Sequence, residues 1–174
     1  MSENKITQID FIESLWYKDL EVNGDLKTYV SNLELNKIDH VKTNFYNTEP
    51  DKKLIDLTMK QVEPFFKEIG SKLKKSGMSL LKVWVQKYED NNYHPVHVHE
   101  PRHDSFSFIF YVDCTETSAC TVFYSPGYPY VDHTTFKLEP KIGRCVLFPG
   151  ALPHEAMPNT DKARLIVSGN IRFH

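Results

Sequence analysis

Residues 80–88, Leu-Leu-Lys-Val-Trp-Val-Gln-Lys-Tyr, open a half of the chain that is rich in β-branched and aromatic residues. Runs of this kind, separated by turn residues, are typical of β-strands. Several short strands with proline and glycine between them predict a sandwich or barrel from residue 78 to residue 174. The further runs lie at 105–112, 120–124, 134–138, 144–148 and 164–173.

The preceding 77 residues are predicted to begin with a strand and a short helix. Residues 6–20 mix aromatic and aliphatic side chains without a helical period, which favours a strand, and a turn is expected at Asn23-Gly24. Apolar residues at helical spacing then predict a helix from Asp25 to about Leu35, with Asn23 as its cap.

A second helix is marked more clearly. The segment Thr48-Glu-Pro-Asp51 has the form of a capping box with proline near the first turn, and apolar residues follow at helical spacing as far as Leu73. Pro64 should kink this helix. We expect both helices to cover one sheet, so that residues 1–77 support a core formed by residues 78–174 within a single domain.

Bulk composition excludes several classes of protein. The 174 residues suffice for one domain, and 40% hydrophobic with 25% charged residues is close to globular averages. A net charge of −2 with scattered lysines disfavours a nucleic-acid partner, and no stretch reaches the run of about 20 apolar residues that a membrane span needs. Three cysteines without a CxxC spacing suit reduced thiols. We therefore expect a soluble, cytoplasmic protein.

Histidine is concentrated in one place. Four of the eight histidines lie in Tyr93-His-Pro-Val-His-Val-His-Glu-Pro-Arg-His103. On an extended strand, residues two apart point to the same side about 7 Å apart, so His97 and His99 could both bind one metal ion while Val98 faces the opposite way. The alternative is a polar loop that happens to contain many histidines.

Two further residues belong to the same hypothesis. In Gly143-Arg-Cys-Val-Leu-Phe-Pro-Gly-Ala-Leu-Pro-His154 a buried strand runs into a turn, which places His154 at the start of a new segment on the rim of a barrel. Arg164 then begins an otherwise apolar strand that should pass through the core. A buried guanidinium needs an anion, such as a carboxylate bound by two contacts. The alternative partner is an Asp or Glu of the chain itself.

Taken together, these segments resemble the iron- and 2-oxoglutarate-dependent oxygenases of the double-stranded β-helix type, also called jelly-roll or cupin-like. The resemblance covers Leu80 to Phe173 and is closest to a group of such oxygenases found in marine phages and bacteria. It is carried by five segments: Trp84-Val-Gln86, Asn92-Tyr-His-Pro-Val-His-Val-His99, Ser107-Phe-Ile-Phe-Tyr-Val112, Leu147-Phe-Pro149 and Arg164-Leu-Ile-Val-Ser-Gly-Asn170.

The resemblance implies a site and a reaction. His97, His99 and His154 would bind Fe(II), and Arg164 would pair with the distal carboxylate of 2-oxoglutarate. The implied reaction hydroxylates a C–H bond of an unknown substrate with O2, while 2-oxoglutarate is decarboxylated to succinate. The candidates for a hydrogen bond to the co-substrate are Tyr88, Gln86 and Ser107, although a core or surface role is equally compatible with the sequence.

His99 departs from the family pattern. Most members have Asp or Glu as the second ligand, which gives two histidines and a carboxylate on one face of the iron. Here three histidines would form that face. Glu100 lies on the opposite side of an ideal strand and replaces the missing carboxylate only if the chain bends, and Asp104 would need a loop to reach the ion.

Two other functions stay open from the sequence. One is a cupin-like three-histidine metalloenzyme that does not use 2-oxoglutarate, against which Arg164 argues. The other is a non-catalytic jelly-roll binding module. His94, His103 and His133 either line the entrance or, as we favour, occupy solvated loop positions. Residues 124–130 either border the substrate entrance or pack rigidly. The sequence identifies neither the prime substrate nor the oligomeric state, and it is compatible with an oligomer.

Overall fold

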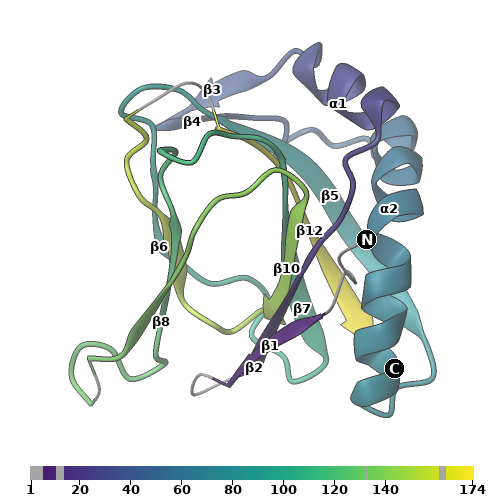
Figure 1. The fold of residues 1–174 in the computed structure, drawn as a ribbon, viewed down its shortest axis with the longest axis vertical. Coiled ribbons are helices and arrows are strands. Elements are labelled where there is room, and N and C mark those ends of the chain that lie inside the picture. The colour runs from purple at the N-terminus through teal and green to yellow at the C-terminus, as the bar shows by residue number, and fades with distance from the viewer. Residues whose placement is uncertain (1–5, 11–13, 132, 161–163) are drawn as a thin grey trace.

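Two antiparallel sheets face each other, and two helices lie outside the larger one (Figure 1). The computed structural model describes residues 6–10, 14–131, 133–160 and 164–174. The larger sheet has eight strands, in the order β1 (Thr7–Asp10), β2 (Ser14–Asp19), β10 (Arg144–Pro149), β7 (Ser105–Asp113), β12 (Arg164–Phe173), β5 (Met78–Tyr88), β4 (Val41–Thr43) and β3 (Asn36–Ile38). The smaller sheet has four, in the order β6 (His94–His97), β11 (His154–Ala156), β8 (Thr121–Tyr124) and β9 (Thr135–Leu138).

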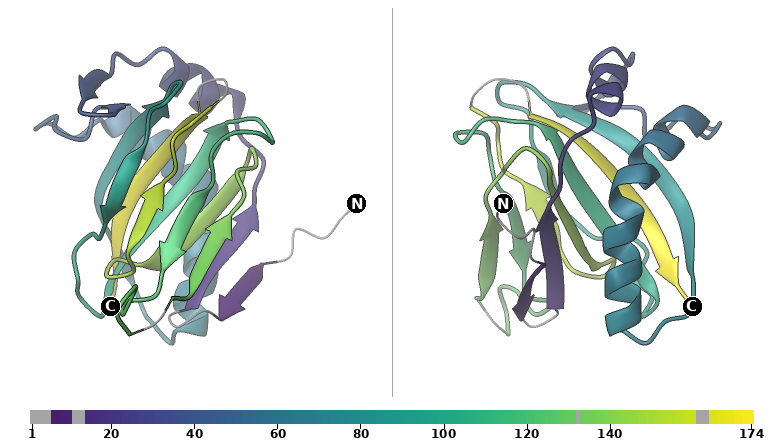
Figure 2. Two further views of the ribbon diagram at one scale, coloured as in Figure 1. Left: turned by 90° about the vertical axis from the view of Figure 1, so that its left-hand side faces the viewer. Right: turned by 45° about the vertical axis from the view of Figure 1, so that its right-hand side comes forward.

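The helices are α1 (Gly24–Ser31) and α2 (Lys52–Lys72). Figure 2 shows α2 lying along the outer face of the larger sheet, on the side away from β6 and β8. The prediction of a mainly β protein whose two N-terminal helices pack on one sheet is therefore confirmed. Neither helix in the described ranges combines the length and the apolar character needed to cross a membrane.

Two apolar layers hold these elements together, and β7 contributes to both. Phe108 and Phe110 pack with α2 residues such as Phe66, whereas Ile109 and Tyr111 pack between the two sheets. Successive side chains of a strand point to opposite faces, and here both faces are covered. This explains why residues 108–112 are apolar throughout instead of alternating with polar residues.

The same alternation positions the residues of β12. Leu165 and Val167 face the helices, while Ile166 packs between the sheets. Arg164 and Ser168 lie on the same side as Ile166 and line the cavity between the sheets. β12 is therefore the strand that presents a buried arginine to the smaller sheet.

Both helices begin close to the predicted positions, with different details. Asn23 caps α1, because its side chain accepts a hydrogen bond from the Asp25 amide at 2.7 Å, but α1 ends at Ser31 and not near Leu35. The cap of α2 is Asp51, whose carboxylate accepts from the Leu54 amide at 2.9 Å. The prediction that placed this cap at Thr48 was wrong by three positions, since an aspartate serves as an N-cap as well as a threonine does.

Some of the short strands were not predicted, although β8 and β9, with four residues each, match the predicted runs at 120–124 and 134–138. Residues 6–20 contain two strands and not one, and the β3–β4 hairpin lies in a stretch to which no element was assigned. Strands of three or four residues contain too few side chains to establish a period. Residues 11–13, within the predicted opening strand, lie outside the described ranges.

Gly169 provides a test of the central pairing. It lies opposite Phe108 in the β12–β7 ladder, and a Cβ at this position would be 2.4 Å from Phe108 Cε1 and 2.6 Å from the Lys82 carbonyl oxygen. We expect Gly169→Ala to lower the free energy of unfolding by about 1–3 kcal/mol, because a backbone oxygen cannot move aside without disturbing the sheet. The measurement is urea unfolding followed by circular dichroism.

The control for this experiment is Gly24→Ala at the start of α1, where nothing lies within 4 Å of the added Cβ. It should leave stability nearly unchanged. Equal stabilities of the two variants would contradict the tight packing at Gly169.

Candidate metal centre and anion pocket

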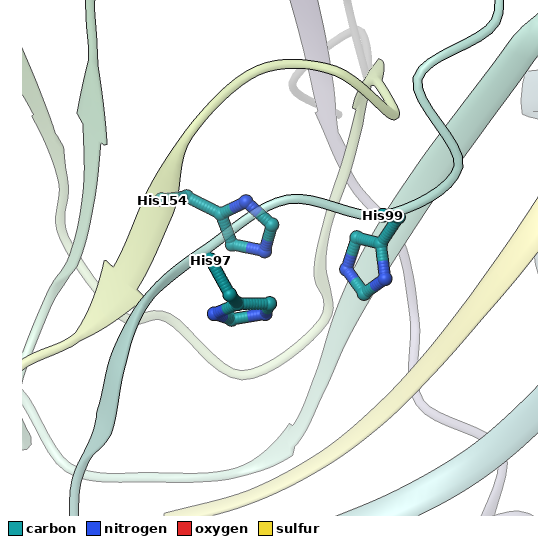
Figure 3. Close-up of side chains that lie close together, drawn as sticks. All are labelled: His97, His99 and His154. Atoms are coloured by element: carbon teal, nitrogen blue, oxygen red, sulfur yellow. The ribbon is translucent and has the colours of Figure 1, made fainter.

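Three histidines converge between the sheets (Figure 3). His97 ends β6, His154 begins β11, and the two residues lie opposite each other in the β6–β11 ladder. His99 follows two residues after the end of β6. One nitrogen from each ring can be chosen so that all three lie within 4.8 Å of one another, a spacing that suits ligands of a single ion. The sequence predicted this group.

Hydrogen bonds orient two of the rings. Nδ1 of His97 lies 2.8 Å from the Pro95 carbonyl oxygen, and Nδ1 of His154 lies 3.0 Å from the Leu152 carbonyl oxygen. A carbonyl only accepts, so each Nδ1 carries the proton that it donates. Nε2 of each ring is then the unprotonated nitrogen, which is the form that binds a metal.

His99 reaches the group by a different route from the one predicted. β6 ends at His97, so His99 belongs to a loop and not to an extended strand. Its amide donates to the Gly150 carbonyl oxygen at 2.8 Å, and its ring packs near the Trp84 ring with centroids 5.7 Å apart. Val98 is 47% exposed, which agrees with the expectation that it faces away from its two neighbours.

Burial keeps these rings neutral. Desolvation lowers the pKa of His97, lowers that of His99 to about 3, and lowers that of His154 well below the ordinary histidine value. The neighbouring imidazoles of the cluster add to the effect on His99 and His154. Three neutral nitrogen donors at pH 7 fit a divalent transition-metal ion such as Fe(II).

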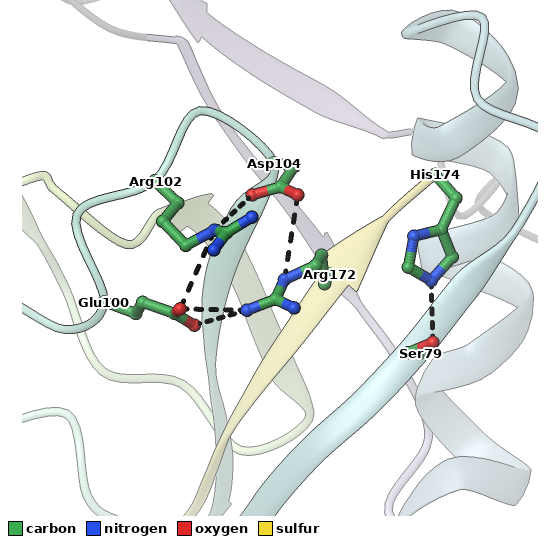
Figure 4. A network of polar contacts seen from close by, with 6 residues as sticks. All are labelled: Ser79, Glu100, Arg102, Asp104, Arg172 and His174. Atoms are coloured by element: carbon green, nitrogen blue, oxygen red, sulfur yellow. Dashed lines mark hydrogen bonds and ion pairs between the residues drawn. The ribbon is translucent and has the colours of Figure 1, made fainter.

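The two carboxylates that the sequence left as alternative ligands are paired elsewhere (Figure 4). Both oxygens of Glu100 lie 2.9 Å from Nη2 of Arg172. Oδ1 of Asp104 lies 3.2 Å from Nε of Arg102, and Oδ2 lies 3.7 Å from Nε of Arg172. Among the described residues, the metal-binding group therefore consists of histidines alone.

Arg164 is fully buried at the start of β12. Its guanidinium stacks on the Tyr88 ring at 4.3 Å, and Nη1 donates to the carbonyl oxygen of Ala119. Nε and Nη2 are buried without an acceptor in the described ranges, and no described Asp or Glu forms an ion pair with this arginine. An unpartnered buried cation is costly, so these two donors fit an anion that enters from outside.

The histidines and Arg164 line one cavity, about 20 Å³ in volume, together with Gln86, Tyr88 and Ser168. A second cavity of about 470 Å³ adjoins it beneath the β3–β4 hairpin. The residues common to both cavities are Trp84, Gln86, His94, His97 and His99. The candidate metal site thus lies where the narrow cavity beside Arg164 meets a wider opening.

Two of the three residues predicted to contact a co-substrate lie here. Gln86 Oε1 accepts from Ser168 Oγ at 3.2 Å. Tyr88 lies beneath Arg164, and burial raises its pKa to about 12, so the phenol is neutral. Ser107 donates instead to Asn170 Oδ1 at 2.9 Å and is absent from the described lining of both cavities.

His94 takes the alternative to a solvated loop position, which was a place at the entrance. It begins β6, lines both cavities, and stacks its ring on His97 with centroids 3.9 Å apart. Its Nδ1 lies 3.3 Å from Nε2 of Gln86. Sequence reasoning missed Trp84, which lines both cavities. Trp84 lies two residues before Gln86 on the same strand, so the two side chains point to the same face of the sheet.

The remaining loop residues lie apart from the site. His103 and His133 are exposed, as predicted. Described residues of the 124–130 loop line neither cavity, and Tyr124 packs against Tyr128 with ring centroids 4.7 Å apart. Of the two interpretations left open for this loop, local packing fits these contacts.

The low histidine pKa values predict how stability depends on pH in the metal-free protein. The unfolded chain takes up protons near pH 6.5, whereas folded His99 does so only near pH 3. Stability is therefore retained above pH 6.5 and falls as the pH decreases, by up to about 1.4 kcal/mol per pH unit for each such histidine. His99→Asn removes one of these groups and should make the decrease shallower.

The measurement is urea unfolding between about pH 7 and about pH 4 with a metal chelator present. His103→Asn is the matched control, because this exposed side chain does not enter the cavity. A pH dependence of His99→Asn as steep as that of the wild type would contradict the burial of His99.

Comparison with known proteins agrees with this geometry. Among solved structures, a prolyl-4-hydroxylase from Pseudomonas putida is 15% identical, with 93% of this chain and 94% of that chain covered and a TM-score of 0.66. An oxidoreductase of the 2OG-Fe(II) oxygenase family from Burkholderia pseudomallei is 11% identical, with 86% of this chain and 77% of that chain covered and a TM-score of 0.68. HygX from Streptomyces hygroscopicus was solved with nickel, 2-oxoglutarate and hygromycin B bound. It is 11% identical, with 91% of this chain and 82% of that chain covered and a TM-score of 0.58.

At such identities these similarities show the fold, and they confirm the double-stranded β-helix. No curated protein matches the sequence. The family described as "Putative 2OG-Fe(II) oxygenase" matches residues 82–170, more than half of the chain. The matched region contains all three histidines and Arg164. The chain therefore belongs to the 2OG-Fe(II) oxygenases, the enzymes that use Fe(II) and 2-oxoglutarate, as its sequence resemblance predicted.

Proposed function

We propose that the protein is a hydroxylase in which His97, His99 and His154 bind Fe(II) and Arg164 binds 2-oxoglutarate. The observation that carries this proposal is a single cavity that contains three neutral imidazoles and a guanidinium with two unpartnered donors. When bound together, Fe(II) and 2-oxoglutarate supply the oxidising power that inserts one oxygen atom of O2 into a substrate C–H bond, with succinate and carbon dioxide as co-products.

The histidines hold the metal without changing their protonation. Because Nδ1 of His97 and Nδ1 of His154 are each bonded to a backbone carbonyl, both rings keep a fixed tautomer and orientation. Three neutral ligands leave the full charge of the ion available to an anionic chelator. An ion held by these three residues would keep positions open for the co-substrate and O2.

Arg164 supplies charge at the other end of the cavity. Its free Nε and Nη2 form the edge of the guanidinium that can bind both oxygens of a carboxylate. The Ala119 carbonyl and the Tyr88 ring fix the plane of this fork before the anion enters. The neutral Tyr88 phenol and the Gln86 amide are the further groups that we assign to the co-substrate.

The larger cavity is the proposed entrance for the prime substrate. It lies beneath the β3–β4 hairpin and borders His97 and His99. Its wall includes Trp84 and Tyr93, with His40 stacked on Tyr93 at a centroid distance of 4.2 Å. A substrate in this cavity would present a C–H bond to the metal from the side opposite Arg164.

Anaerobic titration tests the two halves of the site separately. Addition of Fe(II) and then 2-oxoglutarate to the wild type should produce a weak visible metal-to-ligand charge-transfer band. His154→Ala should abolish this band, because one of three ligands is lost. Arg164→Met should keep Fe(II) binding but raise the dissociation constant of 2-oxoglutarate by at least about 30-fold, the cost of removing one partner from a buried charge pair.

Two variants serve as controls. His103→Ala removes an exposed histidine, and Arg144→Met removes an arginine that pairs with Asp19; neither residue lines the two cavities. Both should behave as the wild type. Absence of metal binding in the wild type, or unchanged 2-oxoglutarate affinity in folded Arg164→Met, would refute the assignment.

A further inference from the structure

The His99 loop has little backbone support. His97 and His154 lie in paired strands, but residues 98–104 follow the end of β6 and belong to no strand. Among the described residues, three backbone bonds join this loop to the rest of the fold. They run from the His99 amide to the Gly150 carbonyl at 2.8 Å, from the Phe173 amide to the Asp104 carbonyl at 3.0 Å, and from the Ser105 amide to the Arg102 carbonyl at 3.1 Å. Gly150 also permits close approach, since a Cβ there would be 2.7 Å from the Glu100 carbonyl oxygen.

Side chains supply the remaining contacts of the loop. Arg172, the ninth residue of β12, places Nη2 2.9 Å from each carboxylate oxygen of Glu100 (Figure 4). Its Nε lies 3.7 Å from Asp104, and Arg102 bridges Asp104 at 3.2 Å and Glu100 at 3.7 Å. We call these four residues, Glu100, Arg102, Asp104 and Arg172, the loop clamp.

The clamp connects the loop to a rigid element. β12 is hydrogen-bonded to β5 on one side and to β7 on the other, so Arg172 projects from the centre of the larger sheet. Its side chain is only 26% exposed, and that of Asp104 is 16% exposed. Partly buried pairs in a network are screened less by water than isolated surface pairs are.

We propose that Arg172 and Glu100 are positioning residues, whose ion pair holds His99 in place for the metal. This inference rests on the proposed function for its purpose, because a ligand must be held within about 0.5 Å of its productive position. The same strand would then fix both ends of the site: Arg164 at its start holds the co-substrate, and Arg172 near its end fixes the metal-ligand loop.

The test uses four variants of the full chain. Glu100→Gln removes the negative charge of the pair with little change of shape, and Arg172→Gln removes the guanidinium with a shorter polar side chain in its place. The exchanged double variant, Glu100→Arg with Arg172→Glu, restores opposite charges in reversed order. Asp19→Asn is the matched control, because Asp19 bonds Arg144 at 2.9 Å with comparable exposure at the other end of the larger sheet.

Two measurements are made on each variant. The first is hydrogen exchange of the His99 amide in the metal-free protein, which reports the loop directly. The second is the dissociation constant for Co(II), a visible substitute for Fe(II), from its absorption bands. Both single variants should lose protection of this amide and bind Co(II) about 10-fold more weakly, the usual effect of removing a group that orients a ligand.

The exchanged variant should recover part of both losses, because it restores the ion pair but also places like charges beside Arg102 and Asp104. Asp19→Asn should show neither loss. Recovery of Co(II) affinity with arginine at position 100 would also show that Glu100 supports His99 and does not itself bind the ion. Unchanged amide protection and affinity in the single variants would overturn the inference. So would equal losses in Asp19→Asn, since the effect would then be general destabilisation.

Failure of the proposed function gives a different result. A wild-type protein that binds no Co(II) would refute the metal site, while the amide measurement would still decide whether the clamp holds the loop. Unfolding midpoints of the metal-free variants, measured alongside, separate a local effect at His99 from a global loss of stability.

Discussion

The pairing of β12 with both β5 and β7 sets the positions of the charged groups in this protein. Ladder hydrogen bonds run along both sides of the strand, so its register cannot shift without turning every side chain to the other face. That register places Arg164 opposite Tyr88, and it keeps Gly169 beneath the Phe108 ring. Arg172 then projects toward the loop that carries His99.

The smaller sheet adds the second constraint, which is the alignment of β6 with β11. His97 and His154 are direct partners in that ladder although 57 positions separate them in the sequence. Each then bonds the carbonyl two residues before it, so strand pairing and ring orientation are fixed together. Only the third histidine depends on a loop, and this is where the ion pairs gather.

The electrostatics of the cavity suit a small dianion and a divalent cation. Burial disfavours charge on the histidines, while Arg164 keeps its charge without a described acidic partner. An anion that binds both the metal and Arg164 would compensate two costs at once, namely the buried guanidinium and the open coordination positions. The carboxylates of the loop are paired with Arg102 and Arg172 and line neither cavity.

The sequence by itself determined the fold class and the family, and it predicted the residues of the candidate site. Histidines two residues apart, a third histidine after a buried strand and an arginine opening an apolar strand are local patterns, so they could be recognised without coordinates. The tertiary structure decided which neighbours complete the site. Ser107 bonds Asn170 and does not line the described cavities. The His94 ring stacks on His97, and Glu100 pairs with Arg172, which lies 72 residues further along the sequence. Such contacts join residues distant in sequence, and they follow from strand register and loop packing, which no local pattern encodes.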